Sequence, residues 1–212
     1  ADYYIKSGDA HNVLVIGADI LSRISDPHDR DSMIYADGAG ATLLTSQKSN
    51  IPTGILAHKT RSDTLEHSEM LFMGDSYLPE NGTKEGVYLK MYGRKLYQYA
   101  LNHVPGAIRA CLHKSGIPLS EIKKVLIHQA NGKMDDAILN RLYKLEDDLS
   151  VPVDVMPMTI SWLGNSSVAT VPTLLDLILK NELDGHQIEK GDKIIFASVG
   201  AGMNINAMVY QA

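Results

Sequence analysis

Continuous apolar runs rich in β-branched residues recur along the chain and predict strands. The first, NVLVIGADI, covers residues 12–20, and another, KKVLIHQ, covers residues 123–129. The run at 12–20 has no polar alternation, which is typical of a strand buried on both faces. Residues 33–46 and 52–63 are also strand-like, and residues 191–212 predict two strands around a Gly-Ala-Gly turn.

Segments with helical spacing of apolar residues alternate with these strands. Residues 87–116 predict two helices, the second opening at Pro105, because proline is favoured in the first turn of a helix. Residues 132–149 predict an amphipathic helix, and residues 165–183 predict another with polar residues at its start. This alternation predicts an α/β fold with helices on both faces of the sheet.

Glycines and turn residues interrupt the pattern at defined places. Gly38 and Gly40 lie inside a strand-like run, which often marks the close approach of another segment. Residues 73–86 are rich in turn formers and predict a surface loop or a connection between two halves. Residues 1–10 have the pattern of a helix tail that ends at Gly8, so we expect the chain to be part of a longer protein.

Composition narrows the class of protein. The 212 residues are 44% hydrophobic, which suffices for one globular body or two small halves. The formal net charge of −5 argues against bulk binding of nucleic acid. The single cysteine, Cys111, excludes an intrachain disulfide and fits a reducing compartment, so we expect a cytoplasmic protein. No apolar run approaches the roughly 20 residues of a membrane span, and we expect no membrane partner.

Polar residues gather where the strand at 123–129 gives way to the next helix. His128 stands at the end of that strand, where side chains can enter the ligand crevice of an open α/β sheet. Position alone favours a simpler explanation, a histidine that only completes local hydrogen bonds. Asn131 precedes the predicted helix, so capping explains it, and Gln129 carries no assignment.

Two further stretches have more polar or flexible residues than local structure requires. Three short polar residues follow a glycine in GNSS, residues 164–167, although one suffices to cap a helix. The stretch SVGAGMN at 198–204 is explained by a hairpin turn, or by a turn whose backbone N–H groups face an oxyanion. A phosphate loop fits less well, because a strand follows the glycines instead of a helix.

Cys111 lies in GAIRACLHKSG, near the end of a predicted helix. A reactive thiolate is stabilised at a helix N-terminus or beside a cation, and a helix C-terminus has the opposite effect. We therefore interpret Cys111 as a core residue and not as a nucleophile.

Five stretches, in this order along the chain, resemble the β-ketoacyl-acyl-carrier-protein synthase III family of condensing enzymes. They are residues 17–44, which end in DGAGATLL, MYGRKLYQYA at 91–100, HQAN at 128–131, GNSS at 164–167 and the glycine turn at 200–202. Each stretch is weak by itself, but five in sequence are specific. The resemblance implies a thiolase-like fold with mixed sheets and helices on both faces.

The family's nucleophile is a cysteine at the N-terminus of a buried helix, and the resemblance makes residues 1–9 the tail of that helix. The acyl-accepting cysteine would then precede Ala1, and the 212 residues alone would be inactive. The resemblance divides the chain into residues 1–84, the end of an incomplete N-terminal half, and residues 85–212, the C-terminal half.

The resemblance gives His128 and Asn165 a shared role. The family moves an acyl group from coenzyme A to its cysteine, decarboxylates malonyl-carrier protein and joins the two. Decarboxylation builds negative charge on the malonyl thioester oxygen, which two neutral donors can stabilise. By the same resemblance the backbone of Ala201 contributes to an oxyanion site, although the family usually has a third glycine there.

Other matched positions concern binding. The resemblance implies that Arg30 stacks on the coenzyme A adenine, that Gly93 lies near the pantetheine channel and that Asn131 belongs to the active site. Lys133 and Arg141 would contact an acidic acyl-carrier protein. No metal or cofactor is implied, because the coenzyme A thioester is a substrate, and the full-length enzyme is expected to be a homodimer.

Two other functions stay open at this point. One is a thiolase-fold acyltransferase of specialised metabolism, which transfers to oxygen, nitrogen or another acceptor. The other is a non-catalytic module that binds coenzyme A or an acyl-carrier protein. A cysteine encoded upstream of Ala1 would favour an enzyme.

Overall fold

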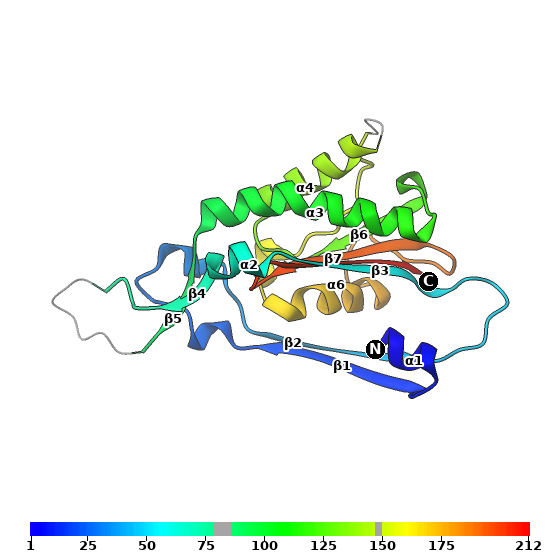
Figure 1. Cartoon of the computed structure of the whole chain (residues 1–212), viewed down its shortest axis with the longest axis horizontal. Helices are drawn as coiled ribbons and strands as arrows, with labels where there is room; N and C mark the ends of the chain where they lie inside the picture. The colour runs from blue at the N-terminus through cyan, green and yellow to red at the C-terminus, as the bar shows by residue number, and fades with distance from the viewer. Residues whose placement is uncertain (79–85, 147–149) are drawn as a thin grey trace.

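The computed structural model describes residues 1–78, 86–146 and 150–212. Its elements form four layers, which Figure 1 displays edge on. Two long helices cover one face of a four-stranded sheet, a shorter helix covers the other face, and a two-stranded ribbon lies beyond that helix. The predicted α/β fold with helices on both faces of a sheet is confirmed.

The central sheet consists of β3 at Gly54–Ser62, β6 at Ile122–Ile127, β7 at Lys193–Gly200 and β8 at Asn204–Gln211. Its strand order is β3-β8-β7-β6. The sheet is mixed, because β6 and β7 run parallel and the other pairs are antiparallel. Parallel neighbours need a crossover connection, and the chain between β6 and β7 supplies helices to both faces.

The predicted division of the chain at residue 84 does not follow the sheets. β3 belongs to the segment 1–84, but it pairs with β8 of the segment 85–212. Residue 84 lies outside the described residues, as do residues 79–85 of the predicted loop.

The long helices are α3, Gly93–Ser115, and α4, Gly132–Leu145. The predicted pair of helices around Pro105 is wrong, because this proline lies inside the continuous helix α3. A proline lacks the N–H that would bond to the carbonyl four residues earlier. That carbonyl, of Leu101, accepts instead from Arg141 Nη1 at 2.9 Å, so α4 supplies the missing donor.

The residues just before α3 form a strand and not the predicted helix. β5, Tyr88–Met91, pairs antiparallel with β4, Leu71–Gly74, in a separate small sheet. At the other predicted boundary, α4 ends at Leu145, and residues 147–149 of the predicted helix lie outside those described.

α6, Thr170–Leu179, lies between the central sheet and the ribbon and begins five residues later than predicted. Ser167 has a φ of 53°, which a regular helix does not allow, and a 3-10 turn precedes α6 instead. α1, Asp2–Ser7, ends at Gly8 in the left-handed conformation, as predicted. The short elements are α2 at Thr64–His67, α5 at Ile160–Leu163 and 3-10 turns at Leu21–Arg23, Arg30–Ile34, Ser68–Met70, Leu119–Glu121 and Ser167–Ala169.

The ribbon pairs β1, Asn12–Asp19, with β2, Gly38–Thr45. Gly40 marks a close approach, as predicted: a Cβ at this position would lie 2.5 Å from Pro172 Cγ of α6. The prediction that the first strand is buried on both faces is wrong for the described residues. The face away from α6 carries Leu14 and Ile16, which are 58% and 65% exposed, because no described element covers it.

A carboxyl group lies in the core of the helical layer without a partner. Asp135, in the first turn of α4, is fully buried, and neither carboxylate oxygen has a hydrogen-bond partner among the described residues. Burial raises the pKa of Asp135 from 3.8 to about 8, a weak approach to the Asn131 backbone opposes the shift, and the neighbouring Asp136 charge adds to it. The folded protein therefore keeps this side chain mostly protonated at neutral pH.

Replacing Asp135 should stabilise the protein. Its folded-state pKa of about 8 exceeds the unfolded value of 3.8, so the stability present at low pH is lost as the pH rises between these two values. Asp135→Asn should remove this pH dependence. Asp135→Leu should also add roughly 1–3 kcal/mol near neutral pH, because it removes an unsatisfied buried polar group. Denaturant unfolding across this pH range measures both effects.

The matched control is Asp136→Asn, which changes an exposed carboxyl in the same turn of α4. This variant should keep the pH dependence of the parent protein, because Asp135 stays buried, and it should show only a small gain in stability from loss of the neighbouring charge. An Asp135→Leu protein that is less stable than the parent at every pH would contradict the account.

Candidate active site

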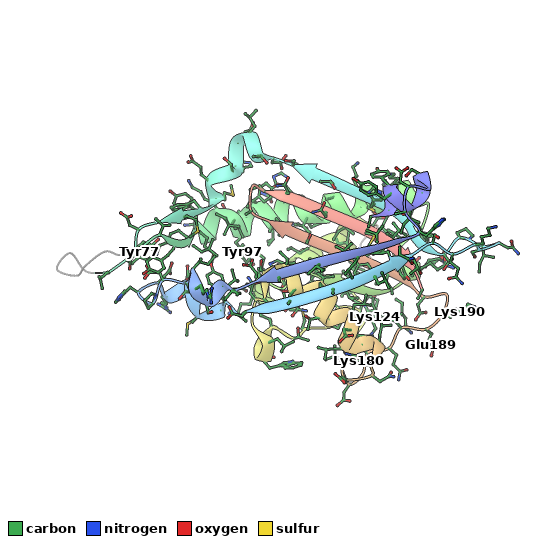
Figure 2. All side chains as sticks on the ribbon, turned by 90° about the horizontal axis from the view of Figure 1, so that it is seen from below. Tyr77, Tyr97, Lys124, Lys180, Glu189 and Lys190 are labelled. Carbon is green, nitrogen blue, oxygen red and sulfur yellow. The ribbon has the colours of Figure 1, made fainter. Side chains whose placement is uncertain are left out.

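A cavity of about 950 Å³ opens between the central sheet, the ribbon and the start of α3. Ligand sites typically have volumes of roughly 300–1,000 Å³. Tyr97, labelled in Figure 2, lines the cavity from α3. The residues predicted to act on substrate or coenzyme A all line this cavity, although they come from distant parts of the chain: Arg30, Gly93, His128, Asn131, Asn165 and Ala201.

His128 lies one residue beyond β6 and extends its pairing with β7, because its backbone N–H donates to Ala197 O at 2.9 Å. This pairing fixes the backbone from which the imidazole enters the cavity. Burial lowers the pKa of His128, and a backbone hydrogen bond with Ser167 opposes that shift. The imidazole is therefore neutral at pH 7, with one ring nitrogen that donates a hydrogen bond and one that accepts.

Asn165 reaches the cavity from a loop that is pinned to the ribbon side. Its N–H donates to Ile34 O at 2.8 Å, and its carbonyl accepts from Ala36 N at 2.9 Å. Gly164 permits this approach, because it has a φ of 68° and a Cβ there would lie 3.1 Å from Ile34 O. The Asn165 Oδ1 atom accepts from Ser167 N at 3.0 Å. That bond commits the oxygen and leaves the amide NH₂ group available to a ligand.

Gln129 is a buried polar residue beside the site to which the sequence assigned no role. It is fully buried, and its Oε1 accepts from the backbone N–H groups of Thr159 and Ile160 at 2.8 and 2.9 Å. Its Nε2 donates to Pro157 O at 3.0 Å. Gln129 therefore ties the residue after His128 to the segment that leads into the Asn165 loop. The only signal in the sequence is its position beside His128.

Two family models match the chain in the expected order. The model for 3-oxoacyl-[acyl-carrier-protein] synthase III matches residues 1–64, and the model for the C-terminal part of the same enzyme matches residues 112–212. The chain belongs to the 3-oxoacyl-[acyl-carrier-protein] synthase III family. The resemblance that the five stretches carry is thereby confirmed.

Named relatives agree with this assignment. The chain is 33% identical over 218 residues to a β-ketoacyl-[acyl-carrier-protein] synthase III of Acaryochloris marina, covering 100% of the chain and 61% of the relative. It is 34% identical over 218 residues to the corresponding protein of Thermosynechococcus vestitus, with 100% and 62% covered. The chain thus spans about three fifths of the length of these relatives.

Solved structures of the synthase III family share the fold. The enzyme from Aquifex aeolicus superposes with a TM-score of 0.81 at 31% identity, covering 100% of the chain and 61% of that structure. The enzyme from Thermus thermophilus gives a TM-score of 0.84 at 26% identity, covering 100% and 62%. These matches confirm the predicted thiolase-like fold with mixed sheets.

The residues predicted to cap α4 or to contact a carrier protein have different surroundings in the structure. Asn131 caps α4, as predicted, because its Oδ1 accepts from Lys133 N and Met134 N at 3.1 and 3.3 Å. Lys133 is exposed in the first turn of α4, two residues from Asn131. Arg141 also donates to Asn102 Oδ1 at 2.7 Å, so this guanidinium already joins α4 to α3.

The cavity rim that carries Arg30 is anchored by a buried ion pair. Asp26 is fully buried and Lys90 is 2% exposed, and the distance between Lys90 Nζ and Asp26 Oδ2 is 2.5 Å. Lys90 Nζ also lies 3.5 Å from the ring centroid of Tyr77, which Figure 2 labels. This pair joins the loop of Arg30 to β5.

Asp26 also accepts hydrogen bonds from other residues around the loop. Its carboxylate accepts from His28 N at 3.0 Å, from Tyr77 N at 2.7 Å and from Ser76 Oγ at 2.8 Å. Burial by itself would raise the pKa of Asp26, but Lys90 and these donors hold it well below its ordinary value. The carboxylate is therefore ionised and fully bonded inside the protein.

Cys111 has the core role expected of it. Its side chain is buried, its Sγ lies 3.5 Å from Ala207 O of β8, and burial raises the pKa of the thiol. Cys111 does not line the cavity. Within the described ranges there is no group of three or more His, Cys, Asp or Glu side chains that could hold a metal ion. No helix in those ranges is long and apolar enough to cross a membrane.

Breaking the buried pair should cost far more than breaking a surface pair. Asp26→Asn leaves the buried Lys90 ammonium with only the more distant Asp29 carboxylate, 3.6 Å away, as its counter-charge. We therefore expect a loss of about 3 kcal/mol in the free energy of unfolding, the lower end of the range for breaking a buried pair. Because the folded-state pKa of Asp26 is depressed, the stability from this pair is present above the unfolded value of 3.8 and lost as the pH falls below it. Denaturant unfolding measures the loss.

Two variants make the result specific. Asp176→Asn breaks the exposed pair with Lys180 on α6 and should leave the unfolding midpoint unchanged. Asp26→Asn combined with Lys90→Met removes both charges but keeps an amide oxygen for the neighbouring donors, so it should recover part of the stability lost in Asp26→Asn. An Asp26→Asn protein as stable as the parent would show that the pair is not a fixed anchor.

Proposed function

We propose that the whole protein condenses an acyl group, delivered as a coenzyme A thioester, with malonyl-acyl-carrier protein in fatty-acid or related biosynthesis. The observation that carries this proposal is that the neutral imidazole of His128 and the oriented amide of Asn165 line one cavity. Family membership supports it. The activity is assigned to the whole protein, because these residues span 61% of a relative's length.

The two donors suit the decarboxylation step. The bond between the malonyl carbon and its carboxylate breaks, carbon dioxide leaves, and the electron pair moves into the thioester to form an enolate. Negative charge therefore grows on the thioester oxygen, where fixed neutral donors stabilise it. The enolate carbon then attacks the acyl thioester on an enzyme cysteine, the new carbon–carbon bond forms, and the cysteine sulfur leaves as a thiolate.

The proposed chemistry needs an acyl-accepting thiol. Cys111 is the only cysteine in the sequence, and it lies in the core outside the cavity. We infer that the whole protein supplies the thiol from sequence beyond these 212 residues, as the family resemblance implies. Ala201 remains our candidate for a backbone donor to the acyl oxyanion.

Four residues support the proposed substrates. Arg30 is exposed at the cavity rim, where a guanidinium plane can stack on an adenine. Gly93 lies further in, at the first residue of α3. Lys133 is our proposed contact for an acidic carrier protein, because it is exposed next to Asn131 at the cavity. Arg141, which bonds to α3, is our second proposed contact for the carrier protein.

The proposed assembly is a cytoplasmic homodimer that needs no cofactor. The apolar outer face of the β1–β2 ribbon supports association, because exposed apolar faces of this kind are usually covered by further protein. A single buried cysteine supports a reducing compartment.

Replacing either donor in the full-length enzyme should stop decarboxylation selectively. His128→Ala should lower carbon dioxide release from malonyl-carrier protein by roughly 10²–10³-fold, because one donor to the enolate oxygen is lost. Acetyl transfer from coenzyme A to the cysteine should persist, since a helix N-terminus can stabilise the thiolate. Asn165→Ala should act similarly, and the two losses should not add. Carbon dioxide release and transfer of radiolabelled acetyl groups measure the two steps.

His113→Ala is the matched control, because this histidine is exposed on α3 and does not line the cavity. Equal loss of both steps in His128→Ala would make His128 the base for the cysteine, and unchanged decarboxylation would make it a structural residue. If the parent enzyme transfers acyl groups but releases no carbon dioxide, the result would favour an acyltransferase whose acceptor is oxygen, nitrogen or another group. In the same assay, Lys133→Ala should raise the KM for malonyl-carrier protein and not for malonyl-coenzyme A.

A further inference from the structure

The turn between β7 and β8 is held by its carbonyl groups. Ala201 O accepts from Asn204 Nδ2 at 3.2 Å, and Gly202 O accepts from Thr64 Oγ1 at 2.7 Å. Met203 O accepts from two donors, which are described below. Three consecutive carbonyls are thus fixed by bonds on the turn, although glycine-rich turns are otherwise among the freest parts of a chain.

The third carbonyl links the turn to α3 and to the end of β3. Met203 O accepts from Asp63 N at 3.1 Å and lies 3.2 Å from Tyr99 Oη. The same hydroxyl makes a shorter bond, 2.7 Å, to Asp63 Oδ2. Arg61 Nε also donates to this oxygen at 2.7 Å. Asp63 therefore bonds to the turn through its backbone and to Tyr99 through its side chain.

The hydrogen-bond network around Asp63 and Tyr99 holds one protonation state and one backbone conformation. Tyr99 is 4% exposed, and burial followed by the bond to Asp63 raises its pKa to about 12. Its hydroxyl therefore keeps its proton and remains a donor. Met203 has a φ of 51°, which is unfavourable for a residue with a side chain, and its side chain is fully buried in the core. Such a conformation persists only where the surroundings over-determine it.

The network lies behind the cavity and not in it. Gly200, Ala201 and Asn204 line the cavity, whereas Asp63 and Tyr99 do not. A change in the network can therefore reach a substrate only through the position of the turn. Peptide units are planar, so the fixed carbonyls of Ala201, Gly202 and Met203 orient the three peptide units that follow the Ala201 N–H along the turn.

We propose that Tyr99 and Asp63 are positioning residues that hold the backbone of the Ala201 turn at the distance and angle needed to bind an oxyanion in the cavity. This inference rests on the proposed function, because it assigns the turn to the acyl-transfer chemistry of that site. Neither side chain touches the substrate. Their effect is to hold the C-terminal side of the turn through Met203 O, so that the turn presents the Ala201 N–H without reorganisation during the reaction.

Tyr99→Phe in the full-length enzyme tests the proposal with a single-atom change. We expect kcat for condensation to fall roughly tenfold to a hundredfold, with the KM for malonyl-carrier protein unchanged, because the donor misplacement affects the transition state more than binding. Asp63→Ala should reproduce this loss. Asp63→Asn should recover part of it, because an amide oxygen still accepts from Tyr99.

Tyr143→Phe is the matched control, because it removes another buried tyrosine hydroxyl in the same core. This hydroxyl has no hydrogen-bond partner among the described residues. The Tyr143→Phe enzyme should keep the kcat and KM of the parent. Thermal unfolding of both variants separates a lost fold from a displaced turn.

Three outcomes decide the proposal. A Tyr99→Phe enzyme with the kcat of Tyr143→Phe would overturn it, and so would a loss of kcat that only follows the fraction unfolded. If the parent enzyme performs no condensation, the proposed function is wrong, and the amide resonance of Ala201 then decides the positioning claim. That resonance should shift in Tyr99→Phe and not in Tyr143→Phe, and equal spectra would overturn the claim.

Discussion

Close packing of the β1–β2 ribbon against the first turn of α6 and the segment before it holds the two walls of the cavity together. A Cβ at Gly40 would lie 2.5 Å from Pro172, and a Cβ at Gly38 would lie 2.8 Å from Ser166 Cβ, so side chains at these positions would push the layers apart. The backbone bonds of Asn165 to Ile34 and Ala36 continue the same contact. Because Asn165 sits on this contact, its amide cannot move independently of the ribbon.

Buried polar groups turn that packing into a defined geometry. Gln129 fixes the segment before α5, the Oδ1 of Asn165 is committed to Ser167, and Asp63 with Tyr99 holds the turn that carries Ala201. Fully bonded buried networks of this kind specify one arrangement, since any other leaves a polar group unpaired. The fully buried Asp135 marks the contrast, because its carboxyl has no partner in the described structure and only costs stability.

Local pattern sufficed for the strands at 52–63, 123–129 and 191–212, for the α4 cap at Asn131 and for the core role of Cys111. Motif resemblance sufficed for the six residues that share the cavity. The predictions that were wrong concern features that depend on contacts between residues far apart in the sequence. The continuity of α3 through Pro105 needs a donor from Arg141, 40 positions from the carbonyl it serves. The Asp26–Lys90 pair joins positions 64 apart, and the exposure of the ribbon depends on which elements cover it. The hydrophobic pattern of a single segment carries no information about contacts with such distant residues.

The central claim is that His128 and Asn165 act as two donors to one oxygen. A crystal structure of the whole protein with a malonyl thioester analogue that cannot lose carbon dioxide tests it most directly. The account predicts that the analogue's thioester oxygen lies about 2.7–3.1 Å from a ring nitrogen of His128 and from Nδ2 of Asn165 at the same time. An oxygen that contacts neither group, or two groups that bind different atoms of the analogue, would contradict it.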